Sequence, residues 1–155
     1  MSQRPTVEAA LAAHGGLVWS LCARLSDEPE DAWQETWERV TRALPGWDPA
    51  GPARLSTWIA TIAHRVLIDQ HRRRRSRGDE VEPDGLIARG SVEAGLDLER
   101  ALARLPGPWR RVVVLHHLAG LSLDEIAETE GVAVGTIKSR LHRARGALVT
   151  LLGGS

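Results

Sequence analysis

The chain has 155 residues, of which 43% are hydrophobic, and it carries equal numbers of basic and acidic residues, 20 of each. This length suits one ordinary domain or two very small ones, and the hydrophobic content excludes a chain without a packed core. No stretch approaches the roughly 18 apolar residues needed to cross a bilayer. The first six residues lack the apolar run of a secretory signal. We therefore expect a cytoplasmic protein without membrane insertion.

The zero net charge hides a strong segregation of charge along the chain. Residues 1–50 carry a net charge of −4, residues 51–78 carry +6, residues 79–99 carry −6 and residues 100–155 carry +4. Clustered arginines are typical of proteins that bind a polyanion. Two basic blocks separated by an acidic one therefore predict two places of contact with nucleic acid. A genomic base bias could explain why arginine outnumbers lysine, but it does not explain the clustering.

Cysteine and histidine usage gives no sign of a disulfide or a metal site. Cys22 is the only cysteine, so neither an internal disulfide nor a cysteine-based zinc site can form within one chain. Its neighbours Leu21 and Leu25 indicate a core thiol rather than a redox sensor. The adjacent pair His116 and His117 is a poor chelate, because neighbouring helical residues point about 100° apart. We expect no metal, no cofactor and no catalytic residues.

The N-terminal half is predicted to form three helices, at residues 6–25, 30–44 and about 56–75. Thr6 is a suitable N-cap for the first, and the glycine pair at 15–16 is expected to break or kink it. A loop rich in proline and glycine follows the second helix at residues 45–52. Trp58 lies in the apolar stripe of the third helix, so we expect it to pack in the core rather than stack on bases.

A second helical domain is predicted after a linker. Residues 79–92 mix acids, proline and glycine without a clear period, which is typical of a flexible linker. Beyond it, helices are expected at residues 93–105 and 109–119, with a break at 106–108. No segment shows the sustained alternation of a strand. We predict an all-α fold with two small helical domains, residues 1–78 and 93–155.

The most specific pattern lies in residues 121–152. Ser122 and Glu125 form a capping box, in which each side chain satisfies a backbone N–H group of the other at the start of a helix. Gly131 permits a sharp turn after about two helical turns, and a second helix is predicted to start near residues 133–134. Two short helices joined by a glycine-containing turn predict a helix-turn-helix, which presents its second helix to the DNA major groove.

The second helix of this motif separates an apolar stripe from a polar face. At 100° per residue, one side gathers Val134, Ile137, Leu141, Ala144 and Leu148. The other side carries hydrogen-bond donors and no acid, which favours DNA contact over an ordinary solvated face of mixed charge. The members of this polar face are Thr136, Lys138, Ser139, His142 and Arg143.

These residues resemble sigma region 4 of the extracytoplasmic-function (ECF) branch of the sigma-70 family. The resemblance runs from residue 96 to residue 152 and is closest in GLSLDEIAETEGVAVGTIKSRLHRARGAL. In that family this domain reads the −35 promoter element. The resemblance implies −35 contacts by Thr136, Lys138, Ser139, Arg140, His142 and Arg143.

The N-terminal half resembles sigma region 2. Its acidic segment at residues 30–37 is similar to the helix that docks on the clamp coiled coil of the polymerase largest subunit, which implies docking by Asp31, Gln34 and Glu35. Residues 55–75 resemble the segment that melts and captures the −10 element. Where the family often has Ala-Arg-Asn, this chain has Ala-His-Arg, so Arg65 replaces an amide near the captured base. The resemblance implies −10 or phosphate contacts by Arg54, Ser56, Arg65, Arg72, Arg73, Arg74 and Arg75.

The resemblance implies a monomeric initiation factor that is not an enzyme. Core RNA polymerase, contacted at its largest-subunit clamp and its flap, would supply the chemistry. This chain would recognise promoter DNA and open the strands. The resemblance also implies an anti-sigma factor that binds between the two domains.

Three other functions compete with this interpretation. An operator-binding regulator could use the helix-turn-helix alone, but such proteins usually carry an α/β receiver or a ligand domain, and residues 6–78 show no strand pattern. An enzyme is disfavoured because no nucleophile–base or metal-ligand spacing is found. A polymerase-docking adaptor that no longer melts DNA is the third, and a run-off transcription assay separates it from an initiation factor.

Overall fold

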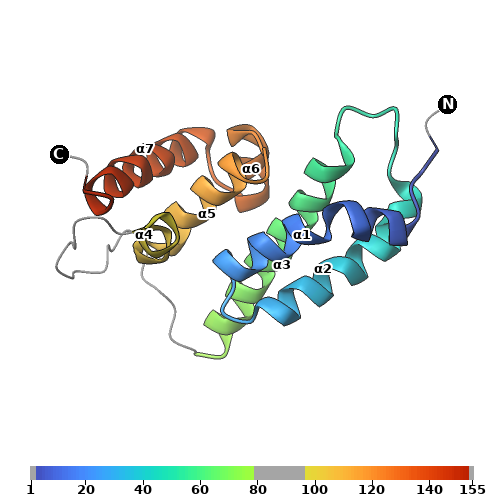
Figure 1. Ribbon diagram of the computed structural model, residues 1–155, viewed down its shortest axis with the longest axis horizontal. Coiled ribbons are helices and arrows are strands. Elements are labelled where there is room, and N and C mark those ends of the chain that lie inside the picture. The colour runs from blue at the N-terminus through green and yellow to red at the C-terminus, as the bar shows by residue number, and fades with distance from the viewer. Residues whose placement is uncertain (1–2, 79–96, 154–155) are drawn as a thin grey trace.

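All regular elements in the described part of the chain are helices (Figure 1). The structure is a computed structural model that describes residues 3–78 and 97–153. An N-terminal bundle contains α1 (Val7–Leu25), α2 (Pro29–Ala43), the short 3₁₀ helix η1 (Leu44–Gly46) and α3 (Leu55–Ser76). A C-terminal bundle contains α4 (Leu98–Arg104), α5 (Gly107–His117), α6 (Leu123–Glu130) and α7 (Val134–Leu151). The predicted all-α fold is confirmed.

Two predicted features fall wholly or partly beyond these residues. The flexible linker predicted at residues 79–92 lies outside the described ranges, and so does the predicted start of the next helix at residue 93. Within the described ranges, no helix has the length and apolar content needed to cross a membrane.

Helix α1 runs without interruption through its glycine pair, so the predicted break at residues 15–16 is wrong. Thr6 caps the helix as predicted, because its hydroxyl accepts a hydrogen bond from the Ala9 N–H at 3.0 Å. A glycine inside a helix costs only about 1 kcal/mol relative to alanine. Tertiary packing offsets that cost, since Val18, Leu21 and Cys22 of the same helix are fully buried.

The core of the N-terminal bundle is formed where α1, α2 and α3 meet. Its largest fully buried side chains include Leu21, Val40 and Ile59. Burial raises the pKa of the Cys22 thiol to about 12, which confirms the expected core thiol. Trp58 packs against this core as predicted, and its ring lies 6.4 Å from that of Trp47 in the preceding loop.

Helix α5 begins earlier than the sequence suggests. The break was expected across residues 106–108, but Pro106 is the N-cap, and Gly107 and Pro108 form the first turn. Proline is well suited to this turn, because the first helical N–H groups have no partner within the helix. Helix α5 then buries Val112 and Leu115 completely at the centre of the C-terminal bundle.

The two bundles are in contact in this arrangement. Helix α1 packs against α5, and α3 packs against α6. In Figure 1 the C-terminal bundle, with α7 on its outer side, lies beside the upper half of α3. The helix-turn-helix therefore lies next to the third helix of the N-terminal bundle.

Candidate nucleic-acid interface and docking face

The helix-turn-helix forms as its sequence pattern predicts. The Ser122 hydroxyl accepts from the Glu125 N–H at 3.0 Å, and the Glu125 carboxylate accepts from the Ser122 N–H at 3.1 Å. Gly131 ends α6 in the left-handed conformation, with φ of 72°, which strains any residue that has a Cβ atom. The capping box therefore marks the start of α6, and the glycine turn separates it from α7.

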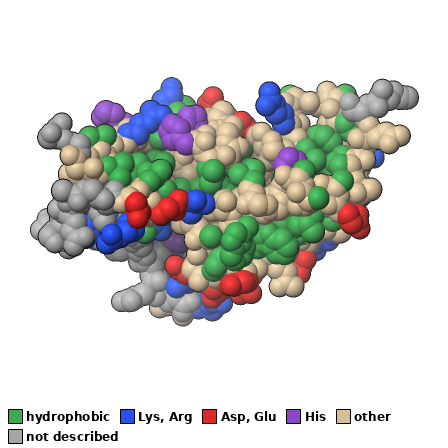
Figure 2. Space-filling view, in the orientation of Figure 1, with side chains coloured by type: hydrophobic (Ala, Val, Ile, Leu, Met, Phe, Trp, Pro, Cys, Tyr) green, Lys and Arg blue, Asp and Glu red, His purple; other side chains and the backbone are tan. Residues whose placement is uncertain are grey.

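Helix α7 divides into a packed stripe and an exposed face. Ile137, Leu141 and Ala144 are buried, and Val134 and Leu148 pack against the core. The five predicted polar-face residues are all exposed: Thr136, Lys138, Ser139, His142 and Arg143. In the view of Figure 2, basic and histidine side chains lie along the upper edge over α7. This face offers hydrogen-bond donors and no carboxylate, as contact with DNA requires.

Arg140 differs from the other predicted residues of this helix. Its side chain is only 17% exposed, and its Nη1 lies 3.4 Å from Glu130 Oε1. The structure therefore directs Arg140 toward the contact between the bundles, whereas Arg143 extends into solvent.

Glu130, at the end of α6, is surrounded by cationic side chains. Its carboxylate accepts from Arg111 Nε at 2.7 Å and Arg111 Nη2 at 2.6 Å, and His64 Nε2 of α3 lies 2.6 Å away. Burial raises the Glu130 pKa, but the hydrogen bonds and charges of His64 and Arg111 lower it to about 2. The side chains of Glu130 and His64 are 5% and 0% exposed, so this is a buried ionic cluster that spans both bundles.

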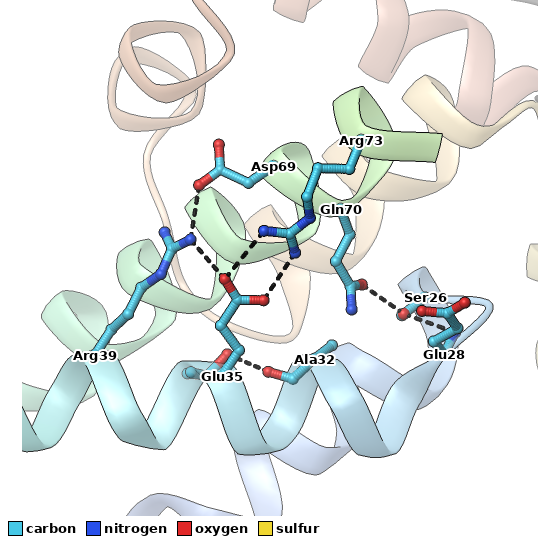
Figure 3. A network of polar contacts seen from close by, with 9 residues as sticks. Ser26, Glu28, Ala32, Glu35, Arg39, Asp69, Gln70 and Arg73 are labelled. Carbon is cyan, nitrogen blue, oxygen red and sulfur yellow. Dashed lines mark hydrogen bonds and ion pairs between the residues drawn. The ribbon is translucent and has the colours of Figure 1, made fainter. Parts of the chain in front are cut away.

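The predicted docking residues on α2 occupy different environments. Asp31 and Gln34 are exposed, whereas the Glu35 side chain is 25% exposed and belongs to a network between α2 and α3 (Figure 3). Glu35 accepts from Arg73 at 2.9 Å and from Arg39 at 2.8 Å, and Arg39 also donates to Asp69 at 2.8 Å. Burial alone raises the Glu35 pKa, but the hydrogen bonds and charges of Arg73 and Arg39 lower it below its ordinary value. Glu35 therefore fastens α2 to α3.

The arginine run at residues 72–75 is not uniform. Arg73 is bound to Glu35, although half of its side chain is exposed, and Arg74 forms an ion pair with Asp27. Arg72 and Arg75 are exposed. Among the described residues, no hydrogen bond or ion pair is found for these two. They are the members of the run best placed to meet a phosphate backbone.

The remaining predicted −10 residues lie on the N-terminal half of α3 and just before it. Arg54 is the exposed N-cap residue of α3, and Ser56 in the first turn is half-buried. Arg65 is exposed, whereas its neighbour His64 is completely buried. Arg54, Ser56 and Arg65 therefore stay accessible in this arrangement, but the face of α3 that carries His64 does not.

A basic cleft of about 670 Å³ lies between the bundles. Asp27 and Glu130 are its acidic lining residues, and the guanidinium groups come from α1, α3, α5 and α7. Burial, together with the charges of Arg111 and Arg75, lowers the pKa of His71 in this cleft, although the charge of Glu130 acts in the opposite direction. The arginines that line the cleft are Arg24, Arg72, Arg74, Arg75, Arg110, Arg111 and Arg140.

Sequence reasoning missed the buried cluster around Glu130. Glu130 and Arg111 are 19 residues apart, and Glu130 and His64 are 66 residues apart, so no short-range spacing connects them. The one available signal was His64 itself, which stands where the family resemblance leads us to expect arginine. The Arg39–Asp69 pair, 30 residues apart, was missed for the same reason.

Comparison with known proteins defines the class of protein to which these bundles correspond. The family model "Sigma-70 region 2" matches residues 11–77, and "Sigma-70, region 4" matches residues 95–148. The probable RNA polymerase sigma-C factor of Mycobacterium bovis is 37% identical over 153 residues, covering 92% of this chain and 81% of that protein. The ECF sigma factor SigW of Bacillus subtilis is 29% identical, covering 84% and 80%. The chain belongs to the ECF group of the sigma-70 family.

Two further comparisons bear on length and fold. The ECF sigma factor SigE of Mycolicibacterium smegmatis is 32% identical over 91% of this chain, but the chain spans only 59% of that protein. The sigma factor RpoE of Bartonella quintana, solved in complex with the anti-sigma factor NepR, matches with a TM-score of 0.69 and 29% identity, covering 94% of this chain and 95% of that one. CnrH, solved with the cytosolic domain of CnrY, has a TM-score of 0.59 and 23% identity over 94% of this chain and 86% of that one, which shows the shared fold.

Proposed function

We propose that this chain binds core RNA polymerase in the cytoplasm and directs promoter-specific initiation of transcription. The observation that carries the proposal is the exposed face of α7, which offers five donor side chains and no acid on a helix-turn-helix. A helix of this kind enters the major groove and reads base edges. The matches to regions 2 and 4, in that order along one chain, support the same function.

The proposed division of labour gives each bundle its own set of contacts. We assign residues 1–78 to polymerase docking and the −10 element, and residues 93–155 to the −35 element. The polymerase would supply the chemistry, contacted at its clamp and flap, and this chain would supply recognition and strand opening. Arg143 and its exposed neighbours on α7 would read bases, whereas Arg72 and Arg75 would bind phosphates without sequence preference.

The docking surface on α2 is centred on Asp31 and Gln34. Both are exposed, so a partner can reach them without disturbing the bundle. Glu35 contributes differently, because its ion pairs with Arg39 and Arg73 hold α2 against α3. Reversal of charge at Glu35 would therefore damage the bundle as well as the docking surface, and Asp31 gives the cleaner test.

The proposed inhibitory partner is an anti-sigma factor. RpoE of Bartonella quintana was solved with such a protein, and we extend that relationship to this chain. The basic cleft between the bundles supports it, because an acidic protein segment would find complementary charge there.

The decisive experiments measure whether this chain directs transcription by core polymerase and whether the two co-purify. Run-off transcription with purified core enzyme should start at a defined site only when this chain is added. The variant Asp31→Lys should lose co-purification with core polymerase. The control Glu8→Lys makes the same charge change at an exposed position on α1 and should behave as the unchanged chain does.

Two outcomes would favour the competing functions. Tight, sequence-specific binding of promoter DNA without polymerase would indicate an operator-binding regulator. Co-purification with core polymerase without run-off product would indicate an adaptor. Unchanged co-purification of Asp31→Lys would show that α2 is not the docking surface.

A further inference from the structure

The contact between the bundles has a specific chemical centre. His64 of α3 and Glu130 of α6 approach to 2.6 Å, and both side chains are buried. The carboxylate can only accept hydrogen bonds, so the His64 Nε2–H group is the donor. Arg111 and Arg140 hold the same carboxylate from within the C-terminal bundle. Among the described residues, His64 is the N-terminal bundle's contribution to the hydrogen bonding of Glu130.

This cluster makes the interface chemically specific, because it pairs buried ionisable groups across the two bundles. The low pKa of Glu130, about 2, keeps its carboxylate charged, and a buried charge is tolerated only while its partners remain in place. A second ion pair crosses the same interface, between Arg24 of α1 and Glu99 of α4 at 2.7 Å, with side chains 29% and 60% exposed. Exposed pairs of this kind contribute little. Of these two ion pairs, the buried one is therefore better placed to restrain the packed arrangement of the bundles.

The closed arrangement involves groups that promoter recognition would use. Helix α3, assigned above to the −10 element, packs against α6, and the face around His64 is covered. Arg140 of the recognition helix is turned toward Glu130 and is largely buried. The same side chains cannot serve this interface and promoter DNA at the same time.

The dimensions of a promoter lead to the same conclusion. Positions −35 and −10 are about 25 base pairs apart, which is roughly 85 Å of duplex at 3.4 Å per base pair. A packed chain of this length has a radius of gyration of only about 15 Å. With α3 and α6 in direct contact, the two bundles cannot reach elements separated by that distance.

We propose that the His64–Glu130 contact latches the two bundles in a closed arrangement that must open before both promoter elements can be read. The proposal rests on the function proposed above, since it concerns how that function is restrained. It assigns to His64 a regulatory role that is separate from any contact with DNA.

The first test locks the interface by a reversible cross-link. The full-length variant Arg24→Cys with Glu99→Cys places two thiols across the interface, at residues outside the assigned DNA and polymerase contacts. A bismaleimide with a reducible disulfide in its spacer would join them. Cys22 should not react, because it is fully buried and its thiol pKa is about 12. Run-off product with core polymerase should fall to background in the cross-linked chain and return after reduction.

Controls separate the latch from the general function. Each single-cysteine variant, treated with the same reagent, should keep its activity, because its adduct does not bridge the bundles. A cross-linked chain that transcribes as well as the reduced one would overturn the proposal. If the variant fails before any cross-linking, the proposed function itself is in question, and the scattering test below then decides the latch alone.

The second test assigns the latch to His64 by two substitutions whose new side chains are isosteric with each other. His64→Gln retains a donor for the Glu130 carboxylate, whereas His64→Glu places a second carboxylate against it. Small-angle X-ray scattering of the full chain should show a larger radius of gyration for His64→Glu than for His64→Gln. Circular dichroism should show equal helix content, which guards against simple unfolding. Equal radii for the two folded variants would overturn the assignment of the latch to this pair.

Discussion

Arg143 gives the sharpest test of how α7 reads DNA. Its side chain is exposed, and no hydrogen bond or ion pair to another described residue is found for it. Replacement by alanine should therefore change the free energy of unfolding by no more than about 0.5 kcal/mol, as is usual at exposed positions. Any larger effect on promoter binding can then be attributed to the loss of a DNA contact.

The expected magnitude depends on the kind of contact that is lost. A bidentate arginine–base contact is worth about 1–3 kcal/mol of discrimination, which corresponds to roughly 5- to 150-fold in affinity. Arg143→Ala should weaken binding to the preferred −35 sequence by this factor. It should weaken binding less where the base pair that Arg143 contacts is already changed, because the contact is then already missing.

Arg75→Ala is the matched control, because it removes another exposed guanidinium, from the arginine run. It should weaken all promoters about equally and lower the slope of log affinity against log salt by roughly one unit. The assay is holoenzyme binding to single-base variants of the −35 element at two salt concentrations. If Arg143→Ala weakened every variant by the same factor, Arg143 would contact phosphate, and its assignment as a base-reading residue would be wrong.

Two further predictions concern stability. Ser122→Ala removes a hydroxyl that accepts a hydrogen bond from the Glu125 N–H, and it should lower the free energy of unfolding by about 1 kcal/mol. Urea denaturation measures this loss. An equal loss in the exposed control Ser139→Ala would contradict a capping role for Ser122. Glu130 has a folded pKa of about 2, below its ordinary value of 4.5, so its contribution of roughly 3 kcal/mol to the free energy of unfolding is present above pH 4.5 and is lost as the pH falls toward 2. Unfolding measured across this range should show a weaker pH dependence in Glu130→Gln than in the exposed control Glu128→Gln, and equal dependence would refute the assignment.

The local features of this fold could be predicted because they depend on neighbouring residues. The capping box needs Ser122 and Glu125 three positions apart, and the turn needs a glycine at position 131. The two faces of α7 follow from the helical period of 3.6 residues. Interactions of this kind are set within one or two turns, so the sequence determines them without knowledge of the rest of the chain.

The same local reasoning was wrong where packing outweighed intrinsic preference. Helix α1 continues through residues 15–16 because its apolar side chains are buried against α2 and α3. The intrinsic preference of glycine is a small energy, and burial of a single leucine side chain contributes more, about 1.5–3 kcal/mol.

The sequence by itself determined the all-helical class, the helix-turn-helix and the donor face of α7, whereas the tertiary structure decided which charged side chains are paired and with which partners. The docking role predicted for Glu35 comes from the family resemblance, and the tertiary structure adds that Arg39 and Arg73 bind its carboxylate. Glu130 received no role from its position in the sequence, and it lies at the centre of the contact between the bundles. Ion pairs join residues that folding brings together from 30 or 66 positions apart. Helical periodicity carries no information at that separation, because it describes one element and not the packing of one element on another.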